Sequence, residues 1–156
     1  MATADETPWH AAFPDPKAKC AEIEPEVVSK LLKGLSTTEH HNQTRDFLLV
    51  DVRRTDWEGG TVATSINLPA QSLYPTRSVI YQMVKQAGVK QVIFYCGSSN
   101  GRGPRSAAWL QDYIDEVGDQ EMKALVMKGG IKGWVRKYGG HHMDWYDEKF
   151  WAEKKE

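Results

Sequence analysis

Blocks of apolar and polar residues alternate along the chain in a pattern that predicts strands and helices in turn. Nearly continuous apolar runs at 47–52 and 91–95 are typical of strands buried on both faces. Shorter apolar segments at 19–23, 65–68 and 124–127 predict three further strands. Strands that alternate with helices favour an α/β fold, in which a mostly parallel central sheet carries helices on both faces.

Helical spacing of apolar residues fills most intervals between these strands. A proline near the start and an apolar face predict helices at 25–33 and 104–117. A third helix is expected after Gly130 and through Tyr138, and a fourth from Ser78 to a stop at Gly88. The residues expected to turn inward from the fourth helix are Val79, Ile80, Met83 and Val84.

The two ends of the chain differ in character. Residues 1–18 contain three prolines and are interpreted as an irregular N-terminal arm, held to the body by Trp9 and Phe13. Residues 19–156 are expected to form a single domain, with a polar loop near 36–45. A terminal helix at 144–154 would close this domain, and the aromatic residues available to pack from it are Trp145, Phe150 and Trp151.

Charge and composition exclude several classes of function. The net charge of -1 and the pI of about 6.5 favour neither a nucleic-acid nor a membrane partner. No apolar run approaches the ~18 residues of a membrane span, and the N-terminus lacks the pattern of a signal peptide. Two distant cysteines indicate a reducing compartment, the cytoplasm or the nucleus, rather than a disulfide scaffold. The histidine pairs at 40–41 and 141–142 are interpreted as polar turns, so no metal site is expected.

The strongest chemical signal lies between the strand at 91–95 and the helix that follows. The strand ends at Cys96, a polar loop with two glycines follows, and five residues separate Cys96 from Arg102. Backbone N–H groups of such a loop can converge on an anion, and the dipole of the following helix favours negative charge at the same point. We therefore expect a lowered pKa for the Cys96 thiol and an anion site beside it.

This arrangement predicts an oxyanion trap with a nucleophile at its base. Cys96 would attack, Arg102 would bind the oxyanion with its planar guanidinium, and Ser99 would hydrogen-bond the thiolate or assist its release. The predicted oxyanion-binding loop comprises Gly97, Ser98, Ser99, Asn100, Gly101 and Arg102. No bound cofactor is expected, and the expected substrate is a tetrahedral, phosphate-type oxyanion.

Several segments together resemble the rhodanese domain. Leu49-Val50-Asp51-Val52-Arg53, Ser65-Ile66-Asn67-Leu68-Pro69 and Lys128-Gly129-Gly130-Ile131-Lys132-Gly133-Trp134 occur in that domain's order and spacing. The Cys-x5-Arg loop and the Arg-Gly-Pro at its end are similar to the cell-division-cycle dual-specificity phosphatases and the fungal arsenate reductases, whereas sulfurtransferase members carry a loop one residue shorter. The resemblance implies a cysteine-dependent phosphatase or arsenate reductase, and it adds an arsenate-type oxyanion to the expected substrates. For a reductase it also implies glutathione or glutaredoxin as the external reductant.

Three features depart from the pattern of those relatives. Tyr95 stands where a histidine usually precedes the cysteine, Thr61 replaces the histidine of a Gly-Gly-His segment, and Gly97 and Gly101 replace loop carboxylates. The absence of loop carboxylates weakens the case for a protein phosphatase more than the case for an arsenate reductase. Protonated arsenate depends less on a proton donor in the enzyme.

Other roles and activities remain open from the sequence alone. Asp56 and Glu58 are the nearest spare carboxylates, while Asp51 and Arg53 are expected to pair with each other structurally. Cys20 is an alternative resolving thiol. The alternative functions are sulfur transfer from thiosulfate and a catalytically weak module that binds phospho-ligands.

Overall fold

Five parallel strands form the central sheet of the computed structural model, which describes residues 7–35 and 45–154. Their bounds are β1 (Glu22–Ile23), β2 (Phe47–Asp51), β4 (Ile66–Asn67), β5 (Gln91–Tyr95) and β6 (Lys123–Met127). The spatial order β1-β6-β5-β2-β4 places β5 at the centre of the sheet. The two long apolar runs of the sequence are therefore neighbours, since β2 pairs with β5 over its full length.

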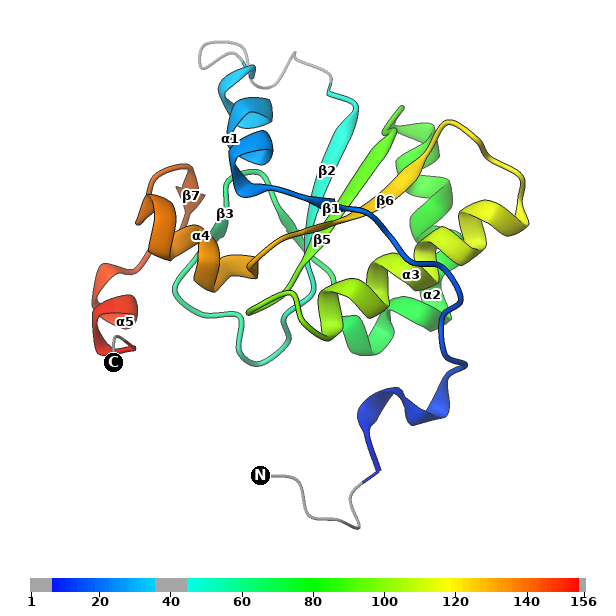
Figure 1. Cartoon of the computed structure of the whole chain (residues 1–156), viewed down its shortest axis with the longest axis horizontal. Coiled ribbons are helices and arrows are strands. Elements are labelled where there is room, and N and C mark those ends of the chain that lie inside the picture. The colour runs from blue at the N-terminus through cyan, green and yellow to red at the C-terminus, as the bar shows by residue number, and fades with distance from the viewer. Residues whose placement is uncertain (1–6, 36–44, 155–156) are drawn as a thin grey trace.

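Helices cover both faces of this sheet, as predicted (Figure 1). On one face lie α1 (Pro25–Lys33) and α4 (Gly130–Tyr138), and on the other lie α2 (Ala70–Gln86) and α3 (Arg102–Glu116). Successive side chains of a strand point to opposite faces. Val92 and Phe94 therefore join the core under α2 and α3, whereas Ile93 and Tyr95 join the core under α1 and α4.

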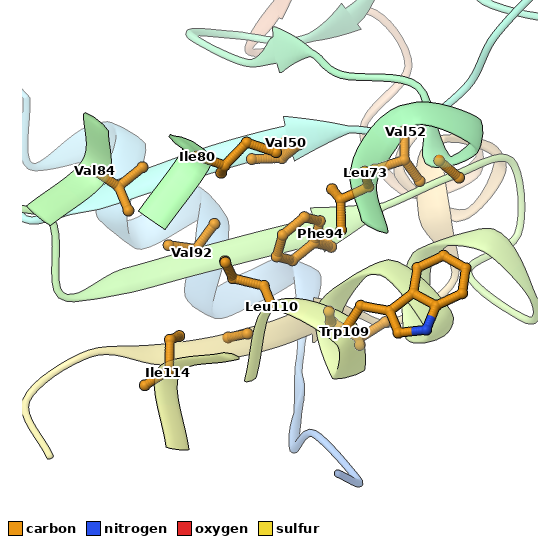
Figure 2. Packing of buried hydrophobic residues seen from close by; sticks show 14 of the residues in the cluster. Val50, Val52, Leu73, Ile80, Val84, Val92, Phe94, Trp109, Leu110 and Ile114 are labelled. Carbon is orange, nitrogen blue, oxygen red and sulfur yellow. The ribbon is translucent and has the colours of Figure 1, made fainter. Parts of the chain in front are cut away.

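The larger core lies between the sheet and the α2–α3 layer (Figure 2). Phe94 of the central strand β5 is fully buried, and Leu73 of α2 and Leu110 of α3 approach it from the helices. Burying each such side chain contributes about 1.5–3 kcal/mol. This core fixes α3 against β5, and α3 begins at Arg102 directly after the candidate loop.

The N-terminal arm is attached to the body by aromatic contacts, as expected from the sequence. It contains a short 3-10 helix, η1 (Trp9–Ala12). Trp9 and Phe13 pack edge-on against Trp109 of α3, with ring centroids 5.9 and 5.8 Å apart. The indole N–H of Trp109 donates a hydrogen bond to the carbonyl oxygen of Pro14 at 2.9 Å. Asp15 of the arm accepts a hydrogen bond from Arg105 in the first turn of α3, so the arm passes close to the candidate loop.

The predicted start of the second helix at Ser78 is wrong, because α2 begins at Ala70 and includes Pro75 in its interior. An interior proline costs about 3 kcal/mol through a lost hydrogen bond and a steric clash. Ala70 and Leu73, both almost completely buried, stabilise the first turns enough to outweigh this cost. The longer helix has a different buried stripe, so Val79 and Met83 are 56% and 49% exposed instead of facing inward.

The predicted terminal helix at 144–154 is also wrong in its first half. Residues at its start form β7 (Met143–Asp144), which pairs antiparallel with β3 (Thr61–Val62), and only α5 (Glu148–Glu153) is helical. Trp145 is 85% exposed and does not pack against the body. Trp151 does so, because its indole N–H donates to the carbonyl oxygen of Gly59 at 2.8 Å.

The remaining differences from the predicted elements are small. The first strand is β1 alone rather than 19–23, and α3 begins two residues before Pro104. Most of the predicted polar loop near 36–45, with its histidine pair, lies outside the described residues. Within the described ranges, no helix is long and apolar enough to cross a membrane.

Candidate active-site loop

Cys96 lies at the carboxyl end of the central strand, where ligands bind in parallel α/β sheets. Its side chain is 2% exposed at the base of the loop that joins β5 to α3. The sulfur accepts hydrogen bonds from the backbone N–H groups of Ser99, at 3.2 Å, and Gly103, at 3.3 Å. Both donors are placed to stabilise negative charge on the sulfur.

The first turn of α4 holds the start of this loop. The backbone N–H groups of Ile131 and Lys132 donate to the carbonyl oxygens of Cys96 and Gly97, both at 3.0 Å. Gly130 makes this approach possible, since it has φ +62° and a Cβ there would lie 2.5 Å from the Cys96 oxygen. The Gly129-Gly130 segment at the start of α4 therefore helps to hold the loop.

The loop leaves several backbone donors free. Within the described part of the chain, the N–H groups of Ser98, Asn100 and Gly101 donate to no protein acceptor. Successive free N–H groups beside a helix N-terminus form a concave anion site. The geometry therefore suits the oxyanion-binding role predicted for this loop.

Ser99 contacts the sulfur differently from the sequence-based expectation. Its backbone is left-handed, with φ +61°, and its N–H rather than its hydroxyl contacts Cys96. The buried Ser99 hydroxyl has no hydrogen-bond partner among the described residues. A role for this hydroxyl in catalysis stays a prediction.

Arg102, the predicted oxyanion ligand, is paired with a carboxylate. Its two terminal nitrogens donate to the two carboxylate oxygens of Asp56, both at 2.7 Å. Hydrogen bonding to Arg102 lowers the pKa of Asp56 to about 2, and the same contact raises the pKa of Arg102. At neutral pH Asp56 is therefore a carboxylate and has no proton to donate.

A buried ion pair holds the turn that carries Asp56. The predicted pairing of Asp51 with Arg53 is confirmed, since their side chains meet at 2.8 Å with exposed fractions of 0% and 2%. The Arg53 guanidinium also donates to the backbone carbonyl oxygens of Glu58, at 3.0 Å, and Gly60, at 2.7 Å. Arg53 thus fixes the shape of the turn opposite the candidate loop.

Tyr95 and Thr61, which both depart from the family pattern, form one hydrogen-bonded cluster. The hydroxyl groups of Tyr95 and Thr61 lie 2.7 Å apart, and the Tyr95 hydroxyl also lies 2.7 Å from that of Ser65. Thr61 in turn donates to Asp51 at 2.8 Å. Tyr95 is fully buried, and desolvation raises the pKa of its hydroxyl. The buried hydroxyl groups of Tyr95 and Thr61 therefore serve as hydrogen-bond partners for each other.

Sequence reasoning missed Lys132 as a residue of the site. Its Cε lies 3.8 Å from the point where a Gly97 Cβ would stand, and an Arg102 terminal nitrogen lies 3.6 Å from the same point. Two cationic side chains therefore flank the start of the loop. The Lys128–Trp134 segment resembles part of the rhodanese domain, but nothing in its spacing assigns Lys132 to the loop.

A cavity of about 740 Å³ adjoins the loop. The loop residues Ser99, Asn100 and Gly101 line one side, and arm residues near Cys20 line the other. Burial, followed by the nearby Asp112 and Asp115 carboxylates, raises the pKa of the Cys20 thiol to about 11. Among the residues that the structure describes, no cluster of three histidine, cysteine or acidic side chains is placed to hold a metal ion.

The fold and this loop define the class of protein. The profile of the rhodanese-like domain family matches residues 29–137. The chain therefore belongs to the rhodanese-like domain family, as its motifs predicted.

Two curated relatives are named for arsenical resistance and for a phosphatase. The chain is 28% identical over 116 residues to Arsenical-resistance protein 2 of Saccharomyces cerevisiae, covering 69% of this chain and 85% of the relative. It is 28% identical over 125 residues to the CDC25-like phosphatase YCH1 of the same yeast, covering 69% and 84%. Among solved structures, the As-Sb reductase from Leishmania major shares the fold with a TM-score of 0.68 at 21% identity, covering 80% of this chain and 84% of that one.

Proposed function

We propose that this protein is a cysteine-dependent enzyme that acts on a small tetrahedral oxyanion and reduces arsenate with an external thiol. The observation that carries the proposal is the Cys96 loop, where two backbone N–H groups meet the sulfur and the loop ends at Arg102. The names of the two yeast relatives, one for arsenical resistance and one for a phosphatase, support the same class of substrate.

In the first step, the Cys96 thiolate attacks the central atom of the oxyanion. An S–As bond forms, an As–O bond breaks, and the departing oxygen leaves as water with protons from the oxyanion and the solvent. The free N–H groups of Ser98, Asn100 and Gly101, together with Arg102, stabilise the charge on the remaining oxygens.

In the second step, an external thiolate attacks the Cys96 sulfur. An S–S bond forms, the S–As bond breaks, and its electron pair stays on arsenic, which becomes arsenite. A second thiol then attacks the mixed disulfide and releases Cys96. One arsenate and two thiols thus give one arsenite, one disulfide and one water, so atoms and electrons balance.

The placement of acids favours arsenate reduction over hydrolysis of a phosphate ester. An ester needs a proton on its leaving oxygen, whereas a protonated arsenate carries its own. The loop contains no carboxylate, and Asp56 stays ionised because Arg102 lowers its pKa to about 2. Phosphatase activity is therefore expected to be low and confined to esters with good leaving groups.

The environment of Cys20 supports an external rather than an internal second thiol. With a pKa raised to about 11, Cys20 is a neutral thiol and a poor nucleophile at neutral pH. The cavity beside Ser99 and Asn100, about 740 Å³, is within the size range of small-molecule sites. Glutathione or glutaredoxin is the reductant that the family resemblance implies.

Parallel assays of one preparation test the proposal. The protein should form arsenite from arsenate when glutathione is present, hydrolyse an aryl phosphate slowly, and transfer no sulfur from thiosulfate to cyanide. Cys96→Ser should abolish arsenite formation, while Cys20→Ser should retain it. Equal rates for the wild type and Cys96→Ser would contradict the proposal. A persulfide on Cys96 would indicate sulfur transfer, and anion binding without turnover would indicate a binding module.

A further inference from the structure

We propose that Asp56 sets the charge preference of the oxyanion site, so that the Cys96 loop binds singly charged oxyanions in preference to dianions. The proposal rests on the proposed function, since it requires oxyanion binding at this loop. It adds a specificity-determining residue that lies outside the loop itself.

The contact between Asp56 and Arg102 is the first observation. Both carboxylate oxygens are engaged by the two terminal nitrogens of Arg102, at 2.7 Å each. This is the bidentate geometry with which arginine binds an oxyanion. The Asp56 carboxylate therefore occupies one edge of the guanidinium and adds a negative charge next to the ligand.

The second observation is that this carboxylate is held in place from behind. The Asp51–Arg53 ion pair is buried, and Arg53 donates to the carbonyl oxygens of Glu58 and Gly60 in the same turn. The Asp56 carboxylate also accepts from the backbone N–H of Arg54 at 3.1 Å. Asp56 thus faces Arg102 because the turn directs it there.

The third observation is the small number of charges that meet at the loop. Arg102 and Lys132 are the cationic side chains next to Gly97, Asp56 opposes Arg102, and Cys96 contributes a negative charge when it is a thiolate. Lys132 and Asp56 are both exposed, so water screens both charges, but Asp56 contacts Arg102 directly. Asp56 therefore offsets part of the positive charge that Arg102 offers to a ligand.

This balance of charges favours the binding of singly charged ligands. An anion on the free edge of Arg102 would lie about 6 Å from the Asp56 carboxylate. With an effective dielectric constant of about 60, the repulsion weakens binding about fivefold for a monoanion and about 20-fold for a dianion. A protonated oxyanion also brings the proton that the loop cannot supply, so the charge preference and the missing acid are consistent.

Permanently charged tetrahedral anions separate charge preference from protonation. Perrhenate is a monoanion and sulfate a dianion at neutral pH, and the amide resonances of Ser99 and Gly103 report binding at the loop. Asp56→Asn should bind sulfate about 20-fold and perrhenate about fivefold more tightly than the wild type. Glu58→Gln is the matched control, because it removes the same charge from the same turn and should change either affinity less than twofold.

The outcomes distinguish the inference from the function on which it rests. Suppose that Arg102→Gln no longer binds either anion, but Asp56→Asn binds both no more tightly than the wild type does. Asp56 then does not set the charge preference, and the inference is overturned. Equal gains for sulfate and perrhenate overturn it as well, since a purely structural role would not depend on ligand charge. If Arg102→Gln binds both anions as the wild type does, the oxyanion site itself is refuted.

Discussion

Replacement of Gly130 by alanine tests the physical link between α4 and the candidate loop. Gly130 has φ +62°, and a Cβ there would lie 2.5 Å from the carbonyl oxygen of Cys96 and 2.6 Å from that of Gly97. A normal contact needs about 3.4 Å, so the loop would have to retreat by about 0.9 Å. That movement would break the hydrogen bonds from Ile131 and Lys132 to the loop.

The expected loss of stability has two parts. A left-handed alanine costs about 1–2 kcal/mol, and reduced freedom of the unfolded chain returns about 0.4–1 kcal/mol. Loss of two hydrogen bonds adds about 1–3 kcal/mol. Gly130→Ala should therefore destabilise by about 1–5 kcal/mol. Gly88→Ala is the control, since Gly88 has φ +79° with no atom within 4 Å of its Cβ position, and should cost about 1 kcal/mol.

Urea denaturation of both variants measures these losses, and arsenite formation measures the effect on the loop. We expect Gly130→Ala to lose most of its activity under conditions in which it remains folded, whereas Gly88→Ala keeps it. Equal stability and equal activity of the two variants would refute the role of Gly130 in holding the loop.

Three further predictions concern charges and thiols. Because Arg102 lowers the pKa of Asp56 from 3.8 to about 2, their pairing stabilises the fold above pH ~4 and is lost as the pH falls towards 2. Asp56→Asn should therefore lower the unfolding free energy at pH 6 but not at pH 2, measured in urea. Because the pKa of Cys20 is raised to about 11, iodoacetamide at pH 7 should leave Cys20 unmodified in a peptide map of the folded protein. Lys132→Met should raise the KM for arsenate about two- to fivefold at low salt without changing stability, and added salt should reduce the difference.

The sequence places the Cys96 loop between a buried strand and a helix, as the structure has it, because the signals for this segment are local. A buried strand, a cysteine, a glycine-bearing loop, an arginine and a proline follow one another within 15 residues, from Gln91 to Arg105. The same holds for the central strands, whose apolar runs require burial on both faces. Each of these features depends on neighbours in the chain, so periodicity and composition suffice to find it.

The features that escaped prediction depend on tertiary contacts. Asp56 and Arg102 are 46 residues apart in the sequence, and no pattern in either segment predicts that they pair. The helix predicted from Ser78 begins at Ala70, because burial of Ala70 and Leu73 stabilises the turns around Pro75. Trp145 looked like a core residue, although pairing of β7 with β3 turns it to solvent. In each case long-range packing overrides a local preference.

The most direct test of the central claim is to find where the external thiol attaches during arsenate reduction. Incubation with arsenate and a limiting amount of glutathione, followed by peptide mass spectrometry, should show a glutathione mixed disulfide on Cys96 that depends on arsenate, with arsenite released in equal amount. Arsenite formation by Cys96→Ser, or an arsenate-dependent mixed disulfide on Cys20 alone, would contradict the account.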